Sequence, residues 1–273
     1  MGIVNVTPDS FSDGGSYLDP EAAIAHGLEL AEAGAAVIDV GGESTRPGAD
    51  PVDADEELRR VLAVVRAIAG QTPVAVSIDT TKAVVARAAL DAGAVMVNDV
   101  SGGTADPDML ALVAQAGSAY VAMHTRGTPR TMQSEARYAS VVREVGDELR
   151  SRVERALAAG VDPRALLADP GIGFAKTGEH NLALLRALPD LAARVGVPLM
   201  VGTSRKSFLA HLMAAATDAD DDRRGRDDAT LATTVWCFER GATLVRVHDV
   251  AGSRRAVDLL DALERATPEG MAA

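Results

Sequence analysis

Residues 169–176 read Asp-Pro-Gly-Ile-Gly-Phe-Ala-Lys, a polar and glycine-rich cluster that directly follows a short apolar run. Two further clusters share this design: Gly-Gly-Glu-Ser-Thr-Arg-Pro-Gly at residues 41–48 and Gly-Thr-Ser-Arg-Lys-Ser at residues 202–207. Each comes after an apolar, β-branched run, which is typical of a buried strand. Strands that repeatedly end in glycine, charged and hydroxyl residues predict one polar rim at one end of a barrel.

Eight strand-like runs alternate along the chain with helix-like segments. The strands are expected near residues 2–6, 36–40, 74–78, 95–99, 118–122, 165–169, 198–201 and 243–247. The helices are expected near residues 20–33, 54–69, 81–91, 107–116, 138–159, 179–195, 204–213 with 227–240, and 253–266. Strand–helix alternation repeated eight times predicts an α/β fold, a single (β/α)8 TIM barrel, and an open doubly wound sheet is the alternative.

Local start and stop signals fit this division. Residues 19–21 read Asp-Pro-Glu, which supplies an N-cap, a first-turn proline and an acid, and Gly34 ends the helix that they begin. We expect one domain over residues 1–273. Within it, the charged tract 214–228 is expected to be a solvated surface excursion, and residues 267–273 a frayed tail.

Composition and charge narrow the class of partner. With 47% apolar residues the chain can bury a large core, and its net charge of −12 argues against nucleic acid or an anionic membrane as a partner. Aromatic residues make up only 3%, too few for a platform that stacks bases. A small anionic substrate stays compatible with this charge, because it needs only a few locally placed cations and backbone N–H groups.

The chain carries no sign of export or membrane insertion. Its first residues lack the basic and apolar regions of a signal peptide, and no apolar run reaches the roughly 18 residues that a membrane span needs. The one cysteine, Cys237, lies between Trp236 and Phe238 and is expected to be a buried small hydrophobe. A cytoplasmic protein is therefore expected.

Active sites of TIM barrels lie at the carboxyl ends of the strands. Every predicted strand end carries at least one polar or functional residue: Asn5, Asp39, Asp79, Asn98 with Asp99, Met123 with His124, Asp169, residues 202–206, and residues 246–249. A single residue of this kind is more often a cap or a turn residue. The convergence of eight strand ends on one rim predicts a polar site.

The side chains at this rim fall into chemical groups. One group offers the acceptors and the amide that suit a flat heterocycle with adjacent N–H donors: Asp79, Asn98 and Asp169. A second group offers the donors that hold a phosphate or a leaving group: Lys206, Arg246 and His248. Asn5 offers one oxygen ligand to a Mg²⁺ ion that bridges a phosphorylated substrate.

Two loops at the rim are flanked by glycine and rich in hydroxyl residues. They are residues 7–15, which read Thr-Pro-Asp-Ser-Phe-Ser-Asp-Gly-Gly, and residues 41–48. Ordinary surface turns have a similar composition, but both loops leave the predicted functional rim. We therefore interpret them as mobile lids that order over a bound substrate and exclude water.

Four more segments are distinctive. They read Ser-Ile-Asp-Thr at 77–80, Asn-Asp-Val-Ser-Gly-Gly at 98–103, Ser-Arg-Lys at 204–206 and Arg-Val-His-Asp-Val at 246–250. Together with residues 2–15, 41–48 and 169–176, and in this order, they resemble the dihydropteroate synthase family over residues 2 to about 266. The resemblance implies a transferase that joins 6-hydroxymethyl-7,8-dihydropterin diphosphate to p-aminobenzoate by a dissociative substitution. It also implies Mg²⁺ as the cofactor and a homodimer.

The resemblance further implies a role for each site residue. The pterin pocket would comprise Asp79, Asn98, Met123, Asp169, Gly202 and Lys206. The diphosphate would be held by Arg246, which also stacks on the pterin, by His248, and by the metal ligand Asn5. The p-aminobenzoate site would comprise Phe11, Ser12, Thr45, Arg46, Pro47, Phe174 and Ser207. Catalysis would involve Asp13, Lys206, Arg246 and His248, with Asp13 facing the developing cation.

Two other functions compete with this one. A pterin-binding barrel of a tetrahydrofolate methyltransferase would keep the three acceptors but would need neither the lids nor Ser207. A non-catalytic pterin-binding paralogue could lose its cations and Asn5 freely. The presence of these features favours a dihydropteroate synthase.

Individual residues carry competing interpretations as well. Lys206 could form a Schiff base, as in barrel aldolases, but the adjacent Arg205 and the acceptor set favour a pterin donor. His124 is expected to be structural and Lys176 to be exposed. Residues 125–126 read Thr-Arg where the family often has Met-Gln, close to the expected pterin rim.

Overall fold

The structure is a computed structural model, and it describes residues 1–7, 19–216 and 223–266. Its strands pair in the order in which they occur in the sequence, and every pair is parallel. They are β1 (Gly2–Asn5), β2 (Val37–Gly41), β3 (Ala75–Asp79), β4 (Met96–Asp99), β5 (Ala119–Met123), β6 (Leu166–Asp169), β7 (Leu199–Val201) and β8 (Ala242–Val245). Each overlaps its predicted range, so the eight predicted strands are confirmed.

The sheet closes on itself between its first and last strands. Gly2 bridges Val247 in parallel, just beyond β8, and the N–H of Ile3 donates to the carbonyl of Val247 over 3.2 Å. The N–H of Val247 donates in turn to the carbonyl of Met1 over 2.9 Å. A parallel sheet of eight strands joined first to last is a barrel. The TIM-barrel prediction is therefore confirmed, and the open sheet is excluded.

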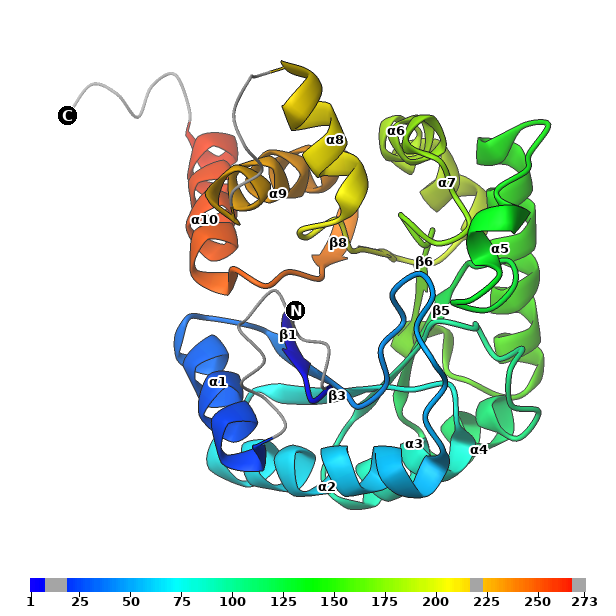
Figure 1. Cartoon of the computed structure of the whole chain (residues 1–273), viewed down its shortest axis with the longest axis vertical. Coiled ribbons are helices and arrows are strands. Elements are labelled where there is room, and N and C mark those ends of the chain that lie inside the picture. Colours follow the sequence, from blue (N-terminus) through cyan, green and yellow to red (C-terminus); the bar gives the residue numbers. More distant parts are fainter. Residues whose placement is uncertain (8–18, 217–222, 267–273) are drawn as a thin grey trace.

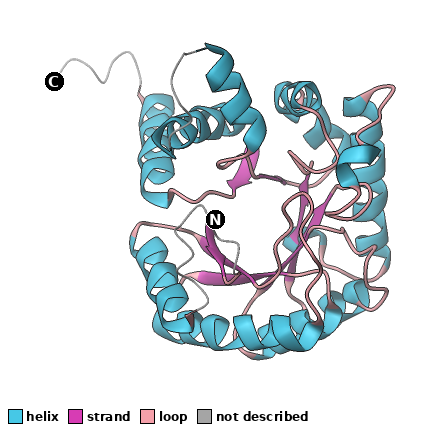
Figure 2. Ribbon diagram, viewed as in Figure 1, coloured by secondary structure: helices cyan, strands magenta, loops and turns pink. Residues whose placement is uncertain are grey.

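Helices surround the barrel on its outer side (Figures 1 and 2). They are α1 (Pro20–Glu32), α2 (Ala54–Gln71), α3 (Ala83–Asp91), α4 (Met109–Ala116), α5 (Val141–Ala158), α6 (Gly178–Arg186), α7 (Leu188–Val195), α8 (Ser207–Ala216), α9 (Arg223–Phe238), α10 (Val250–Arg265), and the short 3₁₀ helices η2 (Met132–Glu135) and η3 (Pro163–Ala165). The predicted cap of α1 is confirmed, since Asp19 accepts the N–H of Glu21 over 3.0 Å. Within the described residues, no helix combines the length and the hydropathy that a membrane span requires.

Side-chain alternation along the strands divides the core into two parts. Successive residues of a strand point to opposite faces of the sheet. One set, which includes Val40, Ile78 and Tyr120, points outward and packs beneath the helices. The other set points into the barrel, where a separate apolar cluster comprises Met1, Val37, Met96, Val121 and Met200. This inner cluster fills the barrel below the carboxyl ends of the strands and leaves those ends for polar residues.

One predicted helix is divided in two. The expected helix at 179–195 forms α6 and α7, which meet at Ala187. Pro189 lies in the first turn of α7, where its ring nitrogen has no hydrogen to donate to the preceding turn. A proline is tolerated at the start of a helix but not within one, so the chain begins a new helix here.

The charged tract at 214–228 is more helical than predicted. Helix α8 extends to Ala216, and α9 begins at Arg223, so the helices take up both ends of the tract. Asp227 in α9 pairs with Arg205 over 2.7 Å, which ties this end of the tract to the barrel rim. The intervening residues 217–222 lie outside the described residues, as does the predicted tail at 267–273.

A buried polar cluster around Asp99 shapes the turn after β4. The carboxylate is fully buried and accepts the N–H groups of Ser101 and Gly103, each over 2.8 Å. It also accepts the hydroxyl of Tyr120 on β5 over 2.8 Å. A buried charge without donors destabilises a fold, so the turn must keep the one conformation in which these three bonds form.

Replacing Tyr120→Phe is expected to lower the free energy of unfolding by about 1.5–3 kcal/mol, because a buried charged acceptor loses a donor. Tyr138→Phe is the matched control, since its hydroxyl donates to the neutral carbonyl of Ala175 over 3.1 Å. Its cost should be about 0.5–1.5 kcal/mol, the range for neutral pairs. Urea unfolding measures both, and equal losses would contradict the role given to Asp99.

Candidate active site

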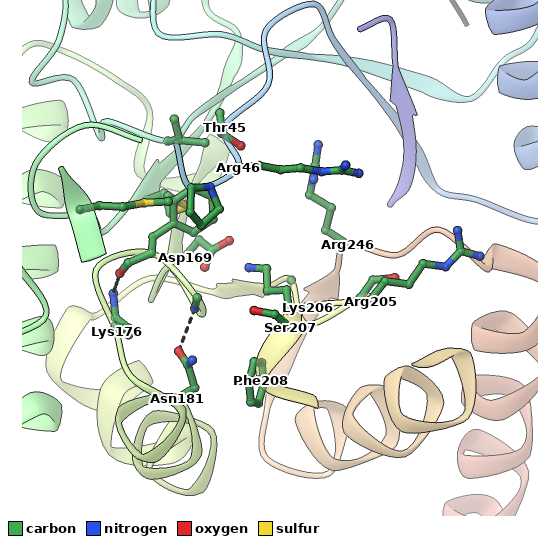
Figure 3. A pocket seen from close by; sticks show the side chains of 18 of the residues that line it. Thr45, Arg46, Asp169, Lys176, Asn181, Arg205, Lys206, Ser207, Phe208 and Arg246 are labelled. Carbon is green, nitrogen blue, oxygen red and sulfur yellow. Dashed lines mark hydrogen bonds between the residues drawn. The ribbon is translucent and has the colours of Figure 1, made fainter. Parts of the chain in front are cut away.

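A pocket of about 1100 Å³ opens at the carboxyl ends of the strands (Figure 3). The last inward-pointing residue of seven strands or strand ends lines it: Asn5, Asp79, Asn98, Met123, Asp169, Gly202 and Arg246. These residues have the same parity as the inner apolar cluster, for example Asn98 after Met96 and Met123 after Val121. The two-residue period of a strand therefore turns the whole set toward the barrel axis.

Every predicted site residue within the described part of the chain lines this one pocket. Besides the strand-end set, these are Thr45, Arg46, Pro47, Phe174, Lys206, Ser207 and His248. Figure 3 shows Arg46 and Arg246 pointing into the same space from different elements. Phe11, Ser12 and Asp13, on the first predicted lid, lie outside the described residues. The structure thus brings the predicted residues together, while their individual roles stay predictions.

Arg246 joins two carboxylates at the centre of the pocket. Its Nε donates to Oδ2 of Asp39 over 2.6 Å, and its Nη2 donates to Oδ2 of Asp79 over 2.9 Å. The side-chain amide of Asn98 donates to the same Oδ2 of Asp39 over 3.0 Å. Asp39 is fully buried, so these donors compensate its charge. Asp39 thereby orients two of the predicted pterin-site residues from below.

Burial brings the charge changes of two site residues close to neutral pH. It raises the pKa of Asp79 to about 7, although the Arg246 guanidinium opposes the shift. Burial also lowers the pKa of Lys206 to about 8, against the attraction of Asp169. Asp169 itself has a pKa raised by burial, with Lys206 opposing. Strong shifts of this kind in a cleft are typical of functional sites.

His248 is held as a neutral donor at the edge of the pocket. The backbone N–H of His248 donates to Oγ of Ser204 over 3.1 Å, and the same Oγ lies 2.8 Å from the ring nitrogen Nδ1 of His248. Burial lowers the pKa of His248 well below its ordinary value, with Arg205 and Arg246 adding to the shift. A hydroxyl that donates to Nδ1 leaves the ring proton on Nε2. That nitrogen can then donate to an anion without adding a charge to the site.

The loop after β2, which carries Thr45, Arg46 and Pro47, is supported by partly buried ion pairs. Lys82 contacts the carboxylate of Glu43 at the start of the loop and that of Glu57 in α2, the latter over 2.6 Å. Glu57 is fully buried, and Arg60 donates to the carbonyl of Gly42 over 2.9 Å. The base of this loop is therefore fixed by side chains from two helical segments.

The burial of three further residues, Lys176, His124 and Cys237, can be compared with its prediction. Lys176 is 3% exposed, so the prediction of an exposed lysine is wrong. Its amine lies in the protein interior, 3.0 Å from Nδ1 of His124. His124 is itself fully buried, as fits a structural residue, and the prediction that Cys237 is buried is confirmed.

Comparison with known proteins agrees with this geometry. Residues 1–248 match the family described as pterin binding enzyme. A dihydropteroate synthase of Mycobacterium leprae is 53% identical over 270 residues, which cover 98% of this chain and 94% of the relative. The chain belongs to the dihydropteroate synthase family of pterin-binding enzymes. Members of this family are transferases, and we conclude that this chain is an enzyme.

Two solved structures of dihydropteroate synthase from Xanthomonas albilineans share the fold. One, solved with 4-aminobenzoic acid, is 44% identical with a TM-score of 0.89 and covers 98% of this chain and 93% of that chain. The other, in complex with 7,8-dihydropteroate, is 41% identical with a TM-score of 0.84 and covers 98% and 94%. The pocket of this dihydropteroate synthase family member thus lies in a barrel whose relatives bind small aromatic and pterin compounds.

Sequence analysis missed the residues that support the site from beneath. Asp39 stands out at a strand end but acquires a role only through Arg246, which is 207 residues away. Its inward parity, shared with Val37 and Gly41, is the signal that could have identified it. Glu57 and Lys82 lie on separate elements, and nothing in their local sequence distinguishes them from exposed helix residues.

Asp39→Asn is expected to lower the free energy of unfolding by about 3 kcal/mol, because it removes the fully buried member of an ion pair and leaves the half-buried Arg246 with one of its two counter-charges. Asp258→Asn is the matched control, since Asp258 pairs with Arg254 over 2.8 Å on the exposed face of α10. That pair should contribute at most about 1 kcal/mol. Chemical unfolding of both variants measures the difference, and similar losses would show that Asp39 is not a buried support.

Proposed function

We propose that this chain transfers the 7,8-dihydropterin-6-ylmethyl group from 6-hydroxymethyl-7,8-dihydropterin diphosphate to p-aminobenzoate. The products would be 7,8-dihydropteroate and diphosphate. The observation that carries the proposal is a single pocket that combines buried acceptors, converging cations and a helix N-terminus. The Xanthomonas albilineans relatives, solved with 4-aminobenzoic acid and with 7,8-dihydropteroate, support it.

The pterin end of the pocket is built on strands and offers acceptors. Asn98 donates its amide to Asp39, so its carbonyl oxygen Oδ1 is turned the other way. That oxygen is buried and has no donor among the described residues, which suits an N–H group of a ligand. Asp79 and Asp169 add two carboxylates to the same wall, and Lys206 adds a donor. Adjacent N–H donors and a carbonyl on a pterin edge complement this set.

The diphosphate would lie beside Arg246 and the neutral donor His248. A guanidinium can donate two parallel N–H groups to phosphate oxygens, and the imidazole Nε2–H would add a third donor. Arg246 would then exchange part of its contact with Asp79 for the substrate. This exchange would release Asp79 to accept from the pterin, so the two ends of the first substrate would bind cooperatively.

Mg²⁺ fits the donor set at this end of the pocket. Asn5 contributes an amide oxygen there, and Mg²⁺ commonly takes few protein ligands together with phosphate oxygens and water. Within the described residues there is no cluster of three or more His, Cys, Asp or Glu side chains that could hold a metal by themselves. When bound, Mg²⁺ would neutralise charge on the diphosphate and favour its departure.

The p-aminobenzoate would lie between the β2 loop and the start of α8. Helix α8 begins at Ser207, whose neighbourhood offers free backbone N–H groups and the positive end of the helix dipole. These features favour the carboxylate of the aromatic acid. Thr45, Pro47 and Phe174 supply the walls around its ring. Because these residues share the pocket with the pterin acceptors, the arrangement favours a synthase over the methyltransferase alternative.

The reaction needs charge stabilisation and positioning rather than a strong base. The bond between the methylene carbon and the diphosphate oxygen breaks first, and its electron pair leaves with diphosphate. The positive charge left on the methylene carbon is delocalised into the pterin, and the aromatic amine then forms the new C–N bond and loses a proton. Asp13 would face this cation from the first lid, and the lids would exclude water during the step.

We also propose a homodimer and a cytoplasmic location for this enzyme. Both rest on the resemblance and the composition. Exposed apolar side chains on the later helices support a dimer surface there: Leu182, Leu212, Met213 and Trp236. A single buried cysteine is compatible with a reducing compartment.

Incubation with the pterin diphosphate, p-aminobenzoate and Mg²⁺ is expected to yield 7,8-dihydropteroate, measured by chromatography. Lys206→Met should reduce kcat/KM by about 100-fold or more, because the pterin loses a preorganised cationic donor. Arg164→Gln, in the exposed turn before β6 where Arg164 pairs with Asp162 over 2.8 Å, is the control and should change the rate by less than about threefold. Absence of product with the wild-type protein would refute the proposed function.

The affinity for 6-hydroxymethyl-7,8-dihydropterin, which lacks phosphates, should be greatest between about pH 7 and about pH 8. Below the raised pKa of Asp79, about 7, its carboxyl is protonated and accepts poorly; above the lowered pKa of Lys206, about 8, the amine loses its charge. Isothermal titration calorimetry across pH measures both limbs. Asp79→Asn should flatten the acid limb and Lys206→Met the alkaline limb, and an unchanged profile in either variant would contradict the assignment.

A further inference from the structure

The loop after β6 has an unusual backbone. Three of its residues lie in the left-handed region: Gly171 with φ of 67°, Gly173 with φ of 85°, and Ala175 with φ of 51°. Glycine adopts this region freely, but Ala175 does so at a cost that its surroundings must offset. Phe174 lies between two of these residues, so the direction of its ring depends on how firmly the loop is held.

Side chains of other elements, and Lys176 of the loop itself, hold successive groups of this loop. Lys206 donates to the carbonyl of Ile172, Asn181 accepts the N–H of Gly173 over 2.8 Å, and Tyr138 donates to the carbonyl of Ala175 over 3.1 Å. Lys176 donates to the carbonyl of Phe174 itself over 2.8 Å. Figure 3 shows Lys176 and Asn181 directed at this loop. Of these side chains, Lys176 is the one that holds Phe174 directly.

The amine of Lys176 is held by a chain of polar contacts that is buried at His124 and partly exposed at Glu148. It lies 3.0 Å from Nδ1 of His124, and Nε2 of His124 lies 3.0 Å from Oε2 of Glu148. An amine that donates to Nδ1 places the ring proton on Nε2, where it donates to the carboxylate. Burial lowers the pKa of His124 to about 4, although Glu148 opposes the shift, so the ring is neutral at neutral pH. Arg126 in turn donates to Glu148 over 3.1 Å.

A buried lysine at this position lowers the stability of the fold, so folding by itself does not explain its presence. It is 3% exposed, and its amine reaches a carbonyl and an imidazole rather than a carboxylate. An uncompensated buried amine destabilises a fold, and an apolar side chain of similar length would pack with less loss. What the amine contributes is therefore the geometry of its acceptor, the Phe174 carbonyl.

Phe174 connects the two ends of the pocket. Its ring centroid lies 5.0 Å from Nζ of Lys206, and it lines the pocket together with Thr45 and Ser207. We propose that Lys176 is a positioning residue that sets where the Phe174 ring meets p-aminobenzoate. This inference rests on the proposed function. The amine of Lys176 is occupied by the carbonyl of Phe174 and by Nδ1 of His124, so Lys176 would act through the loop rather than by binding a substrate.

The proposal predicts a split between the two substrates. Lys176→Met should raise the KM for p-aminobenzoate by about tenfold or more, because small displacements of a positioning group are costly. The Kd for dihydropterin, measured by calorimetry, should change by less than about threefold, since the strand-borne acceptors stay in place. Tyr138→Phe is the matched control: it releases the neighbouring carbonyl of Ala175 and should raise the KM by less than about threefold.

A double-mutant cycle separates positioning from general loosening. In a Phe174→Ala background, Lys176→Met should raise the KM for p-aminobenzoate by less than about twofold, because the side chain through which it acts is gone. Additive effects, or equal loss of affinity for both substrates, would overturn the proposal. If Lys176→Met fails to fold, Lys176→Gln retains a donor on a shorter side chain and should give the same split to a smaller degree.

The result for the wild-type protein keeps the two proposals distinct. If it forms no dihydropteroate, the proposed function fails. If it is active and both Lys176 variants leave the KM for p-aminobenzoate unchanged, only the positioning role fails.

Discussion

The two-residue period of the strands in a closed parallel barrel is the constraint on which this structure depends. Helices cover the outer face, so outward-pointing residues must be apolar or fully bonded, as Asp99 is. Inward-pointing residues meet around one axis, where the apolar cluster fills the lower part and the rim collects polar groups. The same alternation that packs Met96 and Val121 into the barrel therefore presents Asn98 and Met123 to a ligand. Packing and binding are consequences of one geometry.

Several carboxylates and cations meet near the barrel axis, and their charges are compensated largely by one another. Asp39, buried beneath the rim, pairs with Arg246, and Arg246 reaches on to Asp79. The resulting balance is close, since burial pushes the pKa of Asp79 upward and that of Lys206 downward until both approach neutrality. Charges balanced in this way can be reassigned to a substrate at little cost. An isolated buried carboxylate would instead stay protonated and would recognise N–H donors poorly.

The sequence predicted what depends on local patterns and missed what depends on distance. The strands, the helix caps and the polar rim could be predicted, because apolar runs, Asp-Pro pairs and strand-end residues are local signals in the sequence. The division of α6 from α7 was missed although its signal is local, because the helical pattern continues across Pro189. The burial of Lys176 was not readable, since lysines are rarely buried and its acceptors come from the fold. Likewise, the Lys82 pairs with Glu43 and Glu57 join residues 39 and 25 positions apart, which no local pattern records.

The two ends of the pocket are built differently, and this difference has consequences for how the enzyme tolerates change. The residues expected to accept from the pterin stand on strands of the barrel, where the hydrogen bonds of the sheet fix their positions. The residues expected to meet the aromatic acid stand on loops, which depend on supporting side chains such as Lys82 and Lys176. A substitution well outside the pocket can therefore move one loop without disturbing the barrel rim. Discrimination among aromatic acids should be adjustable through these supports, while recognition of the pterin stays tied to the integrity of the fold itself.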